Sequence, residues 1–154
     1  MANTFSQIYI QMVFAVKGRQ SLIQKPWKDE LYKYMTGVFR NKGQKLLAIN
    51  GMPDHVHIFI GQKPNVTTSS LVKDVKVASS RFINEKRWVR GKFAWQEGYG
   101  AFSYGRSQLD TVIRYIQNQE LHHKKWTFRE EYIGLLKKFE IEYDEKYLFD
   151  WLED

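Results

Sequence analysis

The sequence lacks cysteine altogether and contains little histidine or proline. Of its 154 residues none is cysteine, four are histidine and three are proline. The absence of cysteine excludes a disulfide-stabilised scaffold and any metal site built on thiolates. No segment approaches the roughly 20 consecutive apolar residues of a membrane-spanning helix, and the apolar N-terminal segment lacks the basic leader of a signal peptide. We therefore expect one folded domain, residues 1–154, located in the cytoplasm.

Positive charge is what the sequence has in excess. Lys and Arg number 24 against 17 Asp and Glu, which leaves a net charge of +7. This excess favours a polyanionic partner, nucleic acid first and an anionic membrane second, although an ordinary basic protein is equally compatible with it. Basic residues concentrate in residues 73–92, whereas residues 141–154 are acidic and aromatic. Aromatic residues make up 16% of the chain, and several stand beside basic ones, a pattern typical of proteins that bind single strands.

The hydrophobic pattern predicts alternating strands and helices. Strands are predicted at 5–16, 45–49, 55–60 and 93–104. Helices are predicted at 26–43, after 67–70 with a core stripe from Leu71 to Phe82, from 107 to about 123, and in one or two short pieces after residue 126. This β-α-β-β-α-β order is typical of an α+β, ferredoxin-like fold. We expect a four-stranded antiparallel sheet with helices on one face, and in addition a C-terminal helix that bears Tyr115.

Two of the four histidines, His55 and His57, stand two residues apart in the predicted strand 55–60. Side chains two apart on a strand point to the same side, with their Cα atoms about 6.6 Å from each other. Both rings can therefore bind one metal ion, whose bonds to imidazole nitrogen are about 2.0–2.1 Å long. The alternative is a pair of structural core histidines. A metal site needs a third ligand, which in a chain without cysteine is a carboxylate, an amide or another histidine.

The helix predicted from residue 107 offers candidates for the rest of the site. Tyr115 and Gln119 are four residues apart and therefore neighbours on one helix face, and His122 lies one turn further along the same stripe. A tyrosine one turn from a metal-binding amide suggests a nucleophile beside its metal. His122 is a candidate for orienting phosphate or water from that face, whereas His123 is expected to point away. The alternative, which we favour, is that both are helix-end residues stabilised by the C-terminal helix dipole. Asp54 is expected either to orient a metal ligand or to stabilise the turn before His55, and the turn is the favoured interpretation.

Together these motifs resemble a known family. The strand His55-Val56-His57, followed by Tyr115-Ile116-Gln117-Asn118-Gln119, is similar to the single-tyrosine HUH transposases of small insertion sequences, and the likeness spans about residues 3–140. The resemblance implies cleavage and rejoining of single-stranded DNA at element ends, with Tyr115 forming a 5′-phosphotyrosine. It implies Mg²⁺ or Mn²⁺ bound by His55, His57 and Gln119, a DNA hairpin as partner, and a homodimer in which the tyrosine helix acts in trans, inside a bacterial or archaeal cell.

The basic stretch is the candidate surface for that DNA. We expect a hairpin stem to contact some or all of Lys73, Lys76, Arg81, Arg87 and Arg90, although a solvated helix face is an equally good interpretation. Two other functions fit the same residues. The chain is either a non-mobile relative that processes genomic repeat hairpins, or a ferredoxin-like nucleic-acid-binding domain without catalytic activity.

Overall fold

A four-stranded antiparallel sheet lies at the centre of the structure, a computed structural model that describes residues 4–144 and residue 148. The order across the sheet is β2-β3-β1-β4, so β3 and β1 are the central strands. The strands are β1 (Tyr9–Ala15), β2 (Lys45–Met52), β3 (His55–Gly61) and β4 (Gly100–Tyr104). The predicted acidic tail lies mostly outside the described residues.

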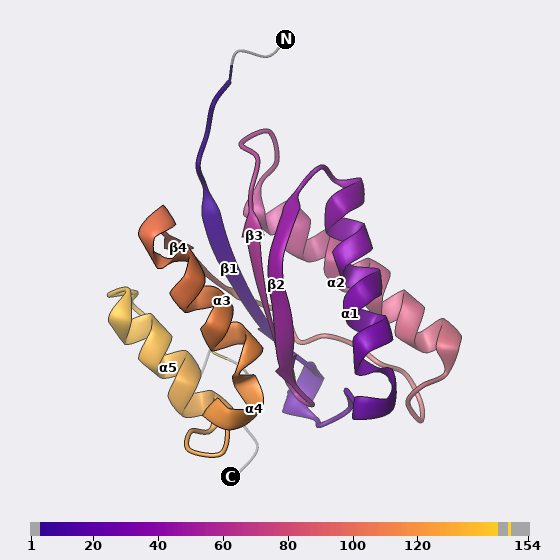
Figure 1. Cartoon of the computed structure of the whole chain (residues 1–154). Helices are drawn as coiled ribbons and strands as arrows, with labels where there is room; N and C mark the ends of the chain where they lie inside the picture. The colour runs from indigo at the N-terminus through magenta and orange to yellow at the C-terminus, as the bar shows by residue number, and fades with distance from the viewer. Residues whose placement is uncertain (1–3, 145–147, 149–154) are drawn as a thin grey trace.

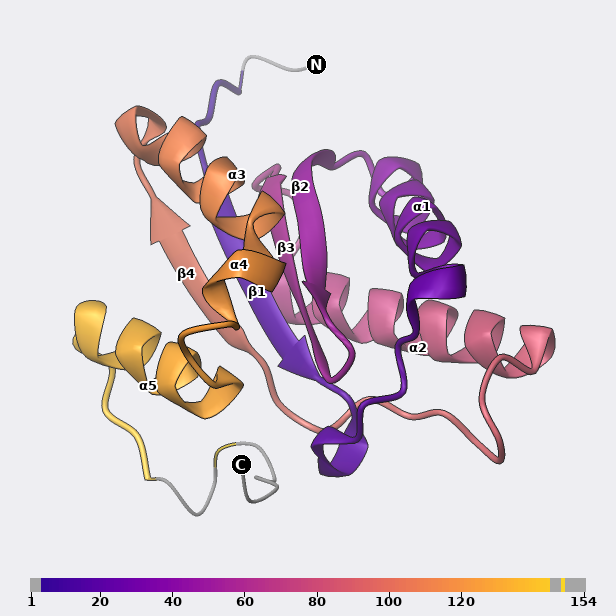
Figure 2. The same cartoon turned by 60° about the horizontal axis from the view of Figure 1, so that its bottom comes forward.

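Helices cover both faces of this sheet (Figures 1 and 2). One face carries the two crossover helices, α1 (Lys25–Asn41) and α2 (Thr68–Lys86). The other face carries three helices that follow β4, namely α3 (Leu109–Gln117), α4 (Gln119–His122) and α5 (Phe128–Lys138). Short 3₁₀ turns at Lys17–Arg19 and Arg106–Gln108 complete the described elements. Within the described part of the chain, no helix is both long and apolar enough to cross a membrane.

The predicted ferredoxin-like topology is confirmed, with two local corrections. The fourth strand was expected at 93–104 but pairs only over Gly100–Tyr104, because Gly98 has a positive φ of 88° that interrupts extended backbone. Residues before it form a loop joined to the sheet by a single bridge between Val16 and Trp95. The third helix was expected to run unbroken to about residue 123, but it ends at Gln117 and restarts at Gln119.

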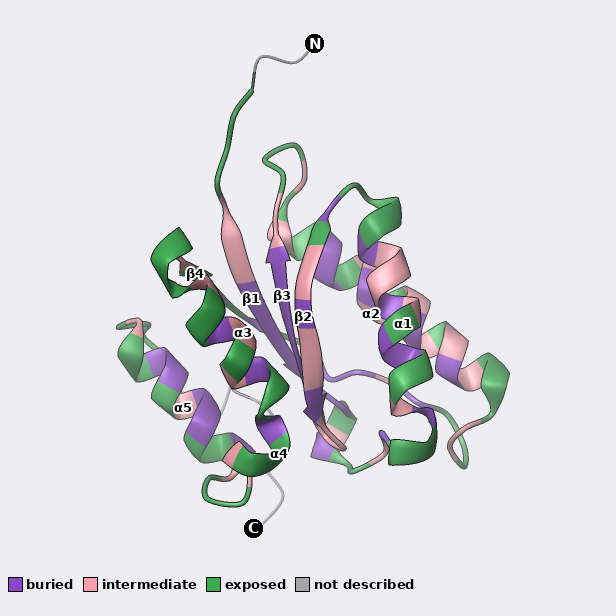
Figure 3. Cartoon of the chain, viewed as in Figure 1, coloured by how far each residue is buried: buried purple, intermediate pink, exposed green. Residues whose placement is uncertain are grey.

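The central strands divide their side chains between the two faces. On the α1/α2 side, alternate residues of β1 and β3 join the largest apolar core, among them Met12, Phe14, Val56, Ile58 and Ile60. This core also takes the buried stripes of both helices, since apolar residues three or four apart share one helix face. Figure 3 shows the inner surfaces of the helices and the centre of the sheet as buried. The residues between them on β1 and β3 point to the α3–α5 side.

Candidate active site

Both predicted histidines lie on β3 and face the α3–α5 side of the sheet. Each is completely buried, and their ring centroids are 5.2 Å apart. Side chains along the strand alternate between the two faces of the sheet here. Val56, between the histidines, and Ile58, after them, both pack in the apolar core on the opposite face. The neighbouring Phe59 continues the histidine face into a small apolar cluster with Val112 and Ile116 of α3. The sheet therefore presents the imidazoles directly beneath the C-terminal helices.

Each imidazole is oriented by an oxygen acceptor at its Nδ1 atom. Asp54 Oδ1 lies 2.8 Å from His55 Nδ1, and Gln11 Oε1 lies 2.8 Å from His57 Nδ1. Because these oxygens accept, each Nδ1 carries a proton and each Nε2 is directed to the other side of its ring. Asp54 is in turn paired with Arg19 at 3.1 Å. Asp54 thus orients the His55 ring, which is the alternative to its favoured role in the turn.

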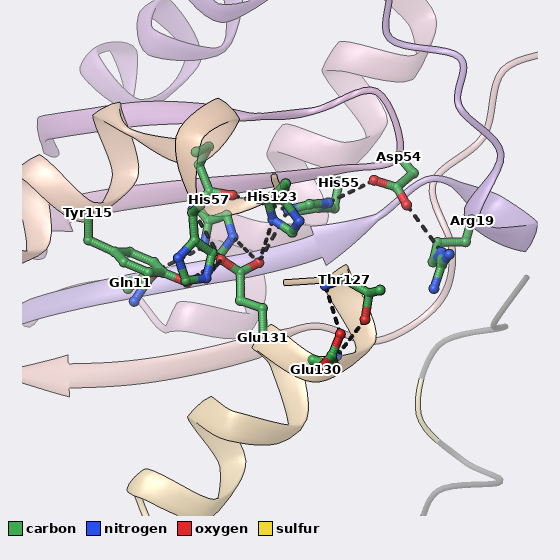
Figure 4. A network of polar contacts seen from close by, with 12 residues as sticks. Gln11, Arg19, Asp54, His55, His57, Tyr115, His123, Thr127, Glu130 and Glu131 are labelled. Carbon is green, nitrogen blue, oxygen red and sulfur yellow. Dashed lines mark hydrogen bonds and ion pairs between the residues drawn. The ribbon is translucent and has the colours of Figure 1, made fainter. Parts of the chain in front are cut away.

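Glu131 of α5 contributes a carboxylate that the sequence-based set of candidates did not include. Its Oε1 atom lies 3.4 Å from His55 Nε2, 3.0 Å from His57 Nε2 and 3.1 Å from His123 Nε2. Its other oxygen, Oε2, accepts hydrogen bonds from the Tyr115 hydroxyl and, at 3.1 Å, from Gln119 Nε2. The side chain is only 1% exposed. Figure 4 shows this carboxylate at the centre of the network.

The local sequence explains why α5 directs Glu131 inward. The helix begins at a capping box, in which Thr127 accepts from the Glu130 amide while the Glu130 side chain accepts from the Thr127 amide. Its buried stripe packs on the sheet and consists of Phe128, Tyr132, Leu135 and Leu136. Glu131 lies within that stripe, and Phe128 stacks on the His55 ring with centroids 3.8 Å apart. A single charged residue in an otherwise apolar stripe was the available sequence signal.

The structure brings the other predicted site residues to the same place. Tyr115 of α3 has its ring centroid 5.8 Å from that of His57 and 4.9 Å from that of His122. Gln119 is fully buried, with Oε1 3.3 Å from His55 Nε2. The expectation that His123 points away is wrong, because the break at Asn118 reorients the helix and turns His123 onto Glu131.

Burial and charge together set the ionisation of these groups. Burial lowers the pKa of His55, but hydrogen bonds to Asp54 and Glu131 outweigh it and raise that pKa to about 9. Burial lowers the pKa of His57. Burial raises the pKa of the Tyr115 phenol, and the Glu131 charge raises it further. The surrounding imidazoles overcome the effect of burial on Glu131 and hold its pKa below the ordinary range, so it is a carboxylate at neutral pH.

The donor set fits a divalent metal ion. The ligand atoms of His55, His57 and Glu131 all lie within 4.8 Å of one another, and all three residues are buried. Bonds of about 2.1 Å at right angles place neighbouring ligand atoms about 3.0 Å apart. The separations of 3.0 and 3.4 Å from Glu131 Oε1 to the two Nε2 atoms are close to that value. This buried group could therefore bind a metal, and the Gln119 amide oxygen lies beside it.

The predicted DNA-contacting residues lie on α2 and the loop after it, on the opposite side of the sheet. Lys73, Lys76 and Arg81 line a groove of about 680 Å³ between α2 and the loop at residues 92–99. The Lys76 ammonium donates to the Gln96 and Gly98 carbonyls at 2.7 Å each. Arg87 instead ends α2 in a left-handed conformation with φ of 55°, and Arg90 is exposed in the loop that follows.

Comparison with known proteins identifies the family. A family model described as an IS200-like transposase matches residues 4–119. The chain belongs to this transposase family. The family resemblance inferred from the HxH and tyrosine motifs is thereby confirmed, and the chain is a DNA-processing enzyme of the insertion-sequence and DNA-recombination class.

Individual relatives agree with this assignment. The ISDra2 transposase TnpA of Deinococcus radiodurans is 24% identical over 120 residues, covering 73% of this chain and 84% of that protein. A crystal structure of a transposase from the same organism has a TM-score of 0.61 at 23% identity, covering 77% of this chain and 95% of that chain. A REP-associated tyrosine transposase bound to a REP hairpin has a TM-score of 0.60 at 16% identity, covering 100% and 91% respectively. These structures share the fold.

The extent of the family match separates two parts of the site. His55, His57, Tyr115 and Gln119 lie inside the matched residues 4–119. Glu131 lies beyond them, on α5. This IS200-like transposase therefore completes its buried polar cluster with a residue that lies beyond the matched segment.

Proposed function

We propose that this chain is a transposase that cleaves and rejoins single-stranded DNA at element ends, with Tyr115 as the nucleophile. The observation that carries the proposal is the convergence of the Tyr115 hydroxyl with two imidazoles, an amide and a carboxylate in one buried cluster. Family membership supplies the class of reaction. The cytoplasmic location expected from the sequence stays a prediction.

The reaction conserves the phosphoester bond at each step. Tyr115 Oη forms a bond to the scissile phosphorus while the bond from phosphorus to the 3′ oxygen breaks, which yields a 5′-phosphotyrosine and a free 3′-hydroxyl. A 3′-hydroxyl from a second strand reverses the step without ATP. The Tyr115 hydroxyl donates to Glu131 Oε2, so this carboxylate is placed to accept the phenolic proton as the new bond forms, and a proton is taken up by the departing 3′ oxygen.

His55, His57 and Gln119 would hold a Mg²⁺ or Mn²⁺ ion, and Glu131 Oε1 would be a further ligand of the same site. Nitrogen ligands suit Mn²⁺ better than Mg²⁺. When bound, the ion polarises the scissile phosphate and stabilises charge that builds up in the transition state. Asp54 and Gln11 accept from the two Nδ1 atoms, which leaves both Nε2 atoms for the ion that they would bind. Gln119 donates from Nε2 to Glu131, and this orients the Gln119 Oε1 atom toward His55.

A DNA hairpin is the proposed substrate. The REP-associated transposase, whose solved structure contains a REP hairpin, matches this chain over its whole length, which supports the assignment. That likeness also favours the second candidate, a non-mobile relative that processes genomic repeat hairpins with the same chemistry. Mobility of a labelled element in cells distinguishes the two, because only the transposase inserts DNA at a new location.

The placement of Tyr115 bears on the oligomeric state. Tyr115 reaches the histidine cluster of its own chain, which supports catalysis in cis. The homodimer with a tyrosine acting in trans, implied by the resemblance, stays a prediction. Mixing Tyr115→Phe with His57→Ala protein tests it. Restored activity in the mixture requires a trans site, and continued inactivity requires a cis site.

A covalent-adduct assay tests the central proposal. The protein is incubated with labelled hairpin DNA and Mn²⁺, and denaturing gels report a tyrosine-linked product. Tyr115→Phe should abolish the adduct and retain DNA binding. The matched control is Tyr9→Phe, whose ring packs near Phe59 on the same sheet face and which should form the adduct normally. An adduct in Tyr115→Phe, or binding without cleavage by the unaltered protein across varied hairpins, would refute the proposal; the second result favours a non-catalytic binding domain.

A further inference from the structure

A hollow of about 370 Å³ opens beside Tyr115, between α3, α5 and the end of β4. Tyr115 and His122 line it beside Glu131 of the metal-binding group, and Tyr104, Trp126 and Lys138 are among its other lining residues. Its volume lies within the range of small-ligand pockets in proteins. A group held here would touch the proposed nucleophile directly, so the hollow is placed to receive part of the substrate.

Gly134 keeps this pocket open. It lies in the middle of α5 with ordinary helical backbone, and a Cβ atom added there would meet nothing within 4 Å. Neither a positive φ nor close packing therefore accounts for glycine at this position. Glycine inside a helix costs about 1 kcal/mol relative to alanine. Gly134 does line the pocket, and a larger side chain at this position would project into the pocket. This is the structural reason that we find for a glycine here.

The remaining walls suit a flat aromatic group. Trp126 is 50% exposed although it is among the largest side chains in the chain. Exposed aromatic faces stack on unpaired nucleobases. Glu130 adds an exposed carboxylate to the same walls, whereas the Glu131 carboxylate is only 1% exposed and faces the histidine cluster. Carboxylates repel a phosphate but accept hydrogen bonds from the amino groups of bases.

We propose that this pocket binds the base of a nucleotide flanking the scissile phosphate, stacked against Trp126. The inference rests on the proposed function: if Tyr115 attacks the scissile phosphate, the nucleotides on either side of that phosphate must lie next to the pocket that Tyr115 lines. The pocket would thereby position the strand and select for bases that carry an amino group. Two of the residues that form it, Trp126 and Gly134, lie outside the family match at residues 4–119.

An NMR titration tests the pocket without any need for cleavage. Full-length, isotope-labelled protein is titrated with each of the four deoxynucleoside 5′-monophosphates, and the Trp126 indole and Gly134 amide signals are followed. We expect both signals to shift, most strongly with dAMP, dCMP and dGMP, which carry amino groups. The base-free probe 2-deoxyribose 5-phosphate should leave them in place. Equal shifts with the base-free probe, or no shift with any nucleotide, would overturn the proposal.

Two variants locate the binding. Gly134→Leu fills the pocket and should eliminate the shifts, whereas Gly134→Ala should retain weaker binding; thermal unfolding checks that both are folded, as expected for better helix formers. Trp126→Ala should weaken binding at least about fivefold. Nucleotide binding by Gly134→Leu equal to that of the unaltered protein contradicts the pocket. Because the titration does not depend on the covalent adduct, failure of Tyr115 as nucleophile and failure of the pocket give separate results.

Discussion

The two faces of the sheet differ in the kind of side chain that they bury. Toward α1 and α2, β3 presents Val56, Ile58 and Ile60 to the largest apolar core. Toward α3, α4 and α5, the same strand presents His55 and His57 to a buried polar cluster. One seven-residue strand thus supplies stability on one side and chemistry on the other. Because side chains alternate along a strand, a single substitution tests one face without altering the other.

The largest effect is expected from substitutions that compare adjacent residues of β3. His57→Ala should lower adduct formation by at least about two orders of magnitude, since stabilisation of transition-state charge worth several kcal/mol is lost. Ile58→Val should lower the free energy of unfolding by about 0.5–1.5 kcal/mol and leave adduct formation intact. Gel assays and urea unfolding measure the two quantities. Loss of the adduct in Ile58→Val at a temperature where it is folded would remove the distinction between the faces.

The orientation of His55 by Asp54 provides a second, smaller effect. Asp54→Ala should weaken Mn²⁺ binding about 10- to 100-fold, as expected when the hydrogen-bond partner of a metal-binding histidine is removed. Asp54→Asn keeps an oxygen acceptor for His55 Nδ1, which lies 2.8 Å from Asp54 Oδ1 in the unaltered protein. This variant should therefore lose less Mn²⁺ affinity than the alanine variant. Calorimetric titration with Mn²⁺ measures both. Equal affinities in the alanine variant and the unaltered protein would show that Asp54 serves only the turn and Arg19.

A smaller effect is expected in the basic groove on the other side of the sheet. In a Tyr115→Phe background, Lys73→Ala and Arg81→Ala should each weaken hairpin binding and reduce the slope of log Kd against log salt by about 1. Lys33→Ala, an exposed lysine of α1 outside the groove, is the control and should change neither. A change with Lys33→Ala as large as with the groove residues would mean that general charge, not the groove, attracts DNA.

The smallest effect concerns the pH dependence of stability. Burial lowers the pKa of Lys76 from its ordinary value of 10.5 to about 8 in the folded protein. Between these values the unfolded chain retains a proton that the folded chain has lost, so this lysine makes stability rise with pH in that window. Urea unfolding from pH 7.5 to 10 should show a smaller rise, or a steeper fall, in Lys76→Met than in the unaltered protein. If stability changed with pH in the same way in both proteins, the lowered pKa of Lys76 would be contradicted.

Local spacing explains which features were predictable. His55 and His57 share a strand face and Tyr115 and Gln119 lie one helical turn apart, so sequence distances of two and four already imply neighbours. Their meeting could not be derived from the spacing, because it depends on α3 packing across the sheet. The family resemblance supplied that step for Tyr115 and Gln119. It did not extend to Glu131, whose partner His57 is 74 residues away in sequence.

The corrections have a common physical origin. The break at Asn118 turned His123 toward Glu131, and nothing in residues 109–123 marks it as strongly as proline or glycine would. The hydrogen bond between Gln11 and His57 likewise depends on strand register. The register places Val13 opposite His57 and brings Gln11, on the same face of the sheet, within reach of the His57 ring. Both contacts are set by tertiary packing, which overrides local preference.

The span of the buried cluster along the chain has a consequence for synthesis. Gln11 lies in the first strand and Glu131 in the last helix, yet both contact His57. A polypeptide leaving the ribosome N-terminus first exposes its tyrosine and both imidazoles well before the carboxylate emerges. The buried cluster is therefore complete only after α5 has emerged, when all of its other residues have already been synthesised.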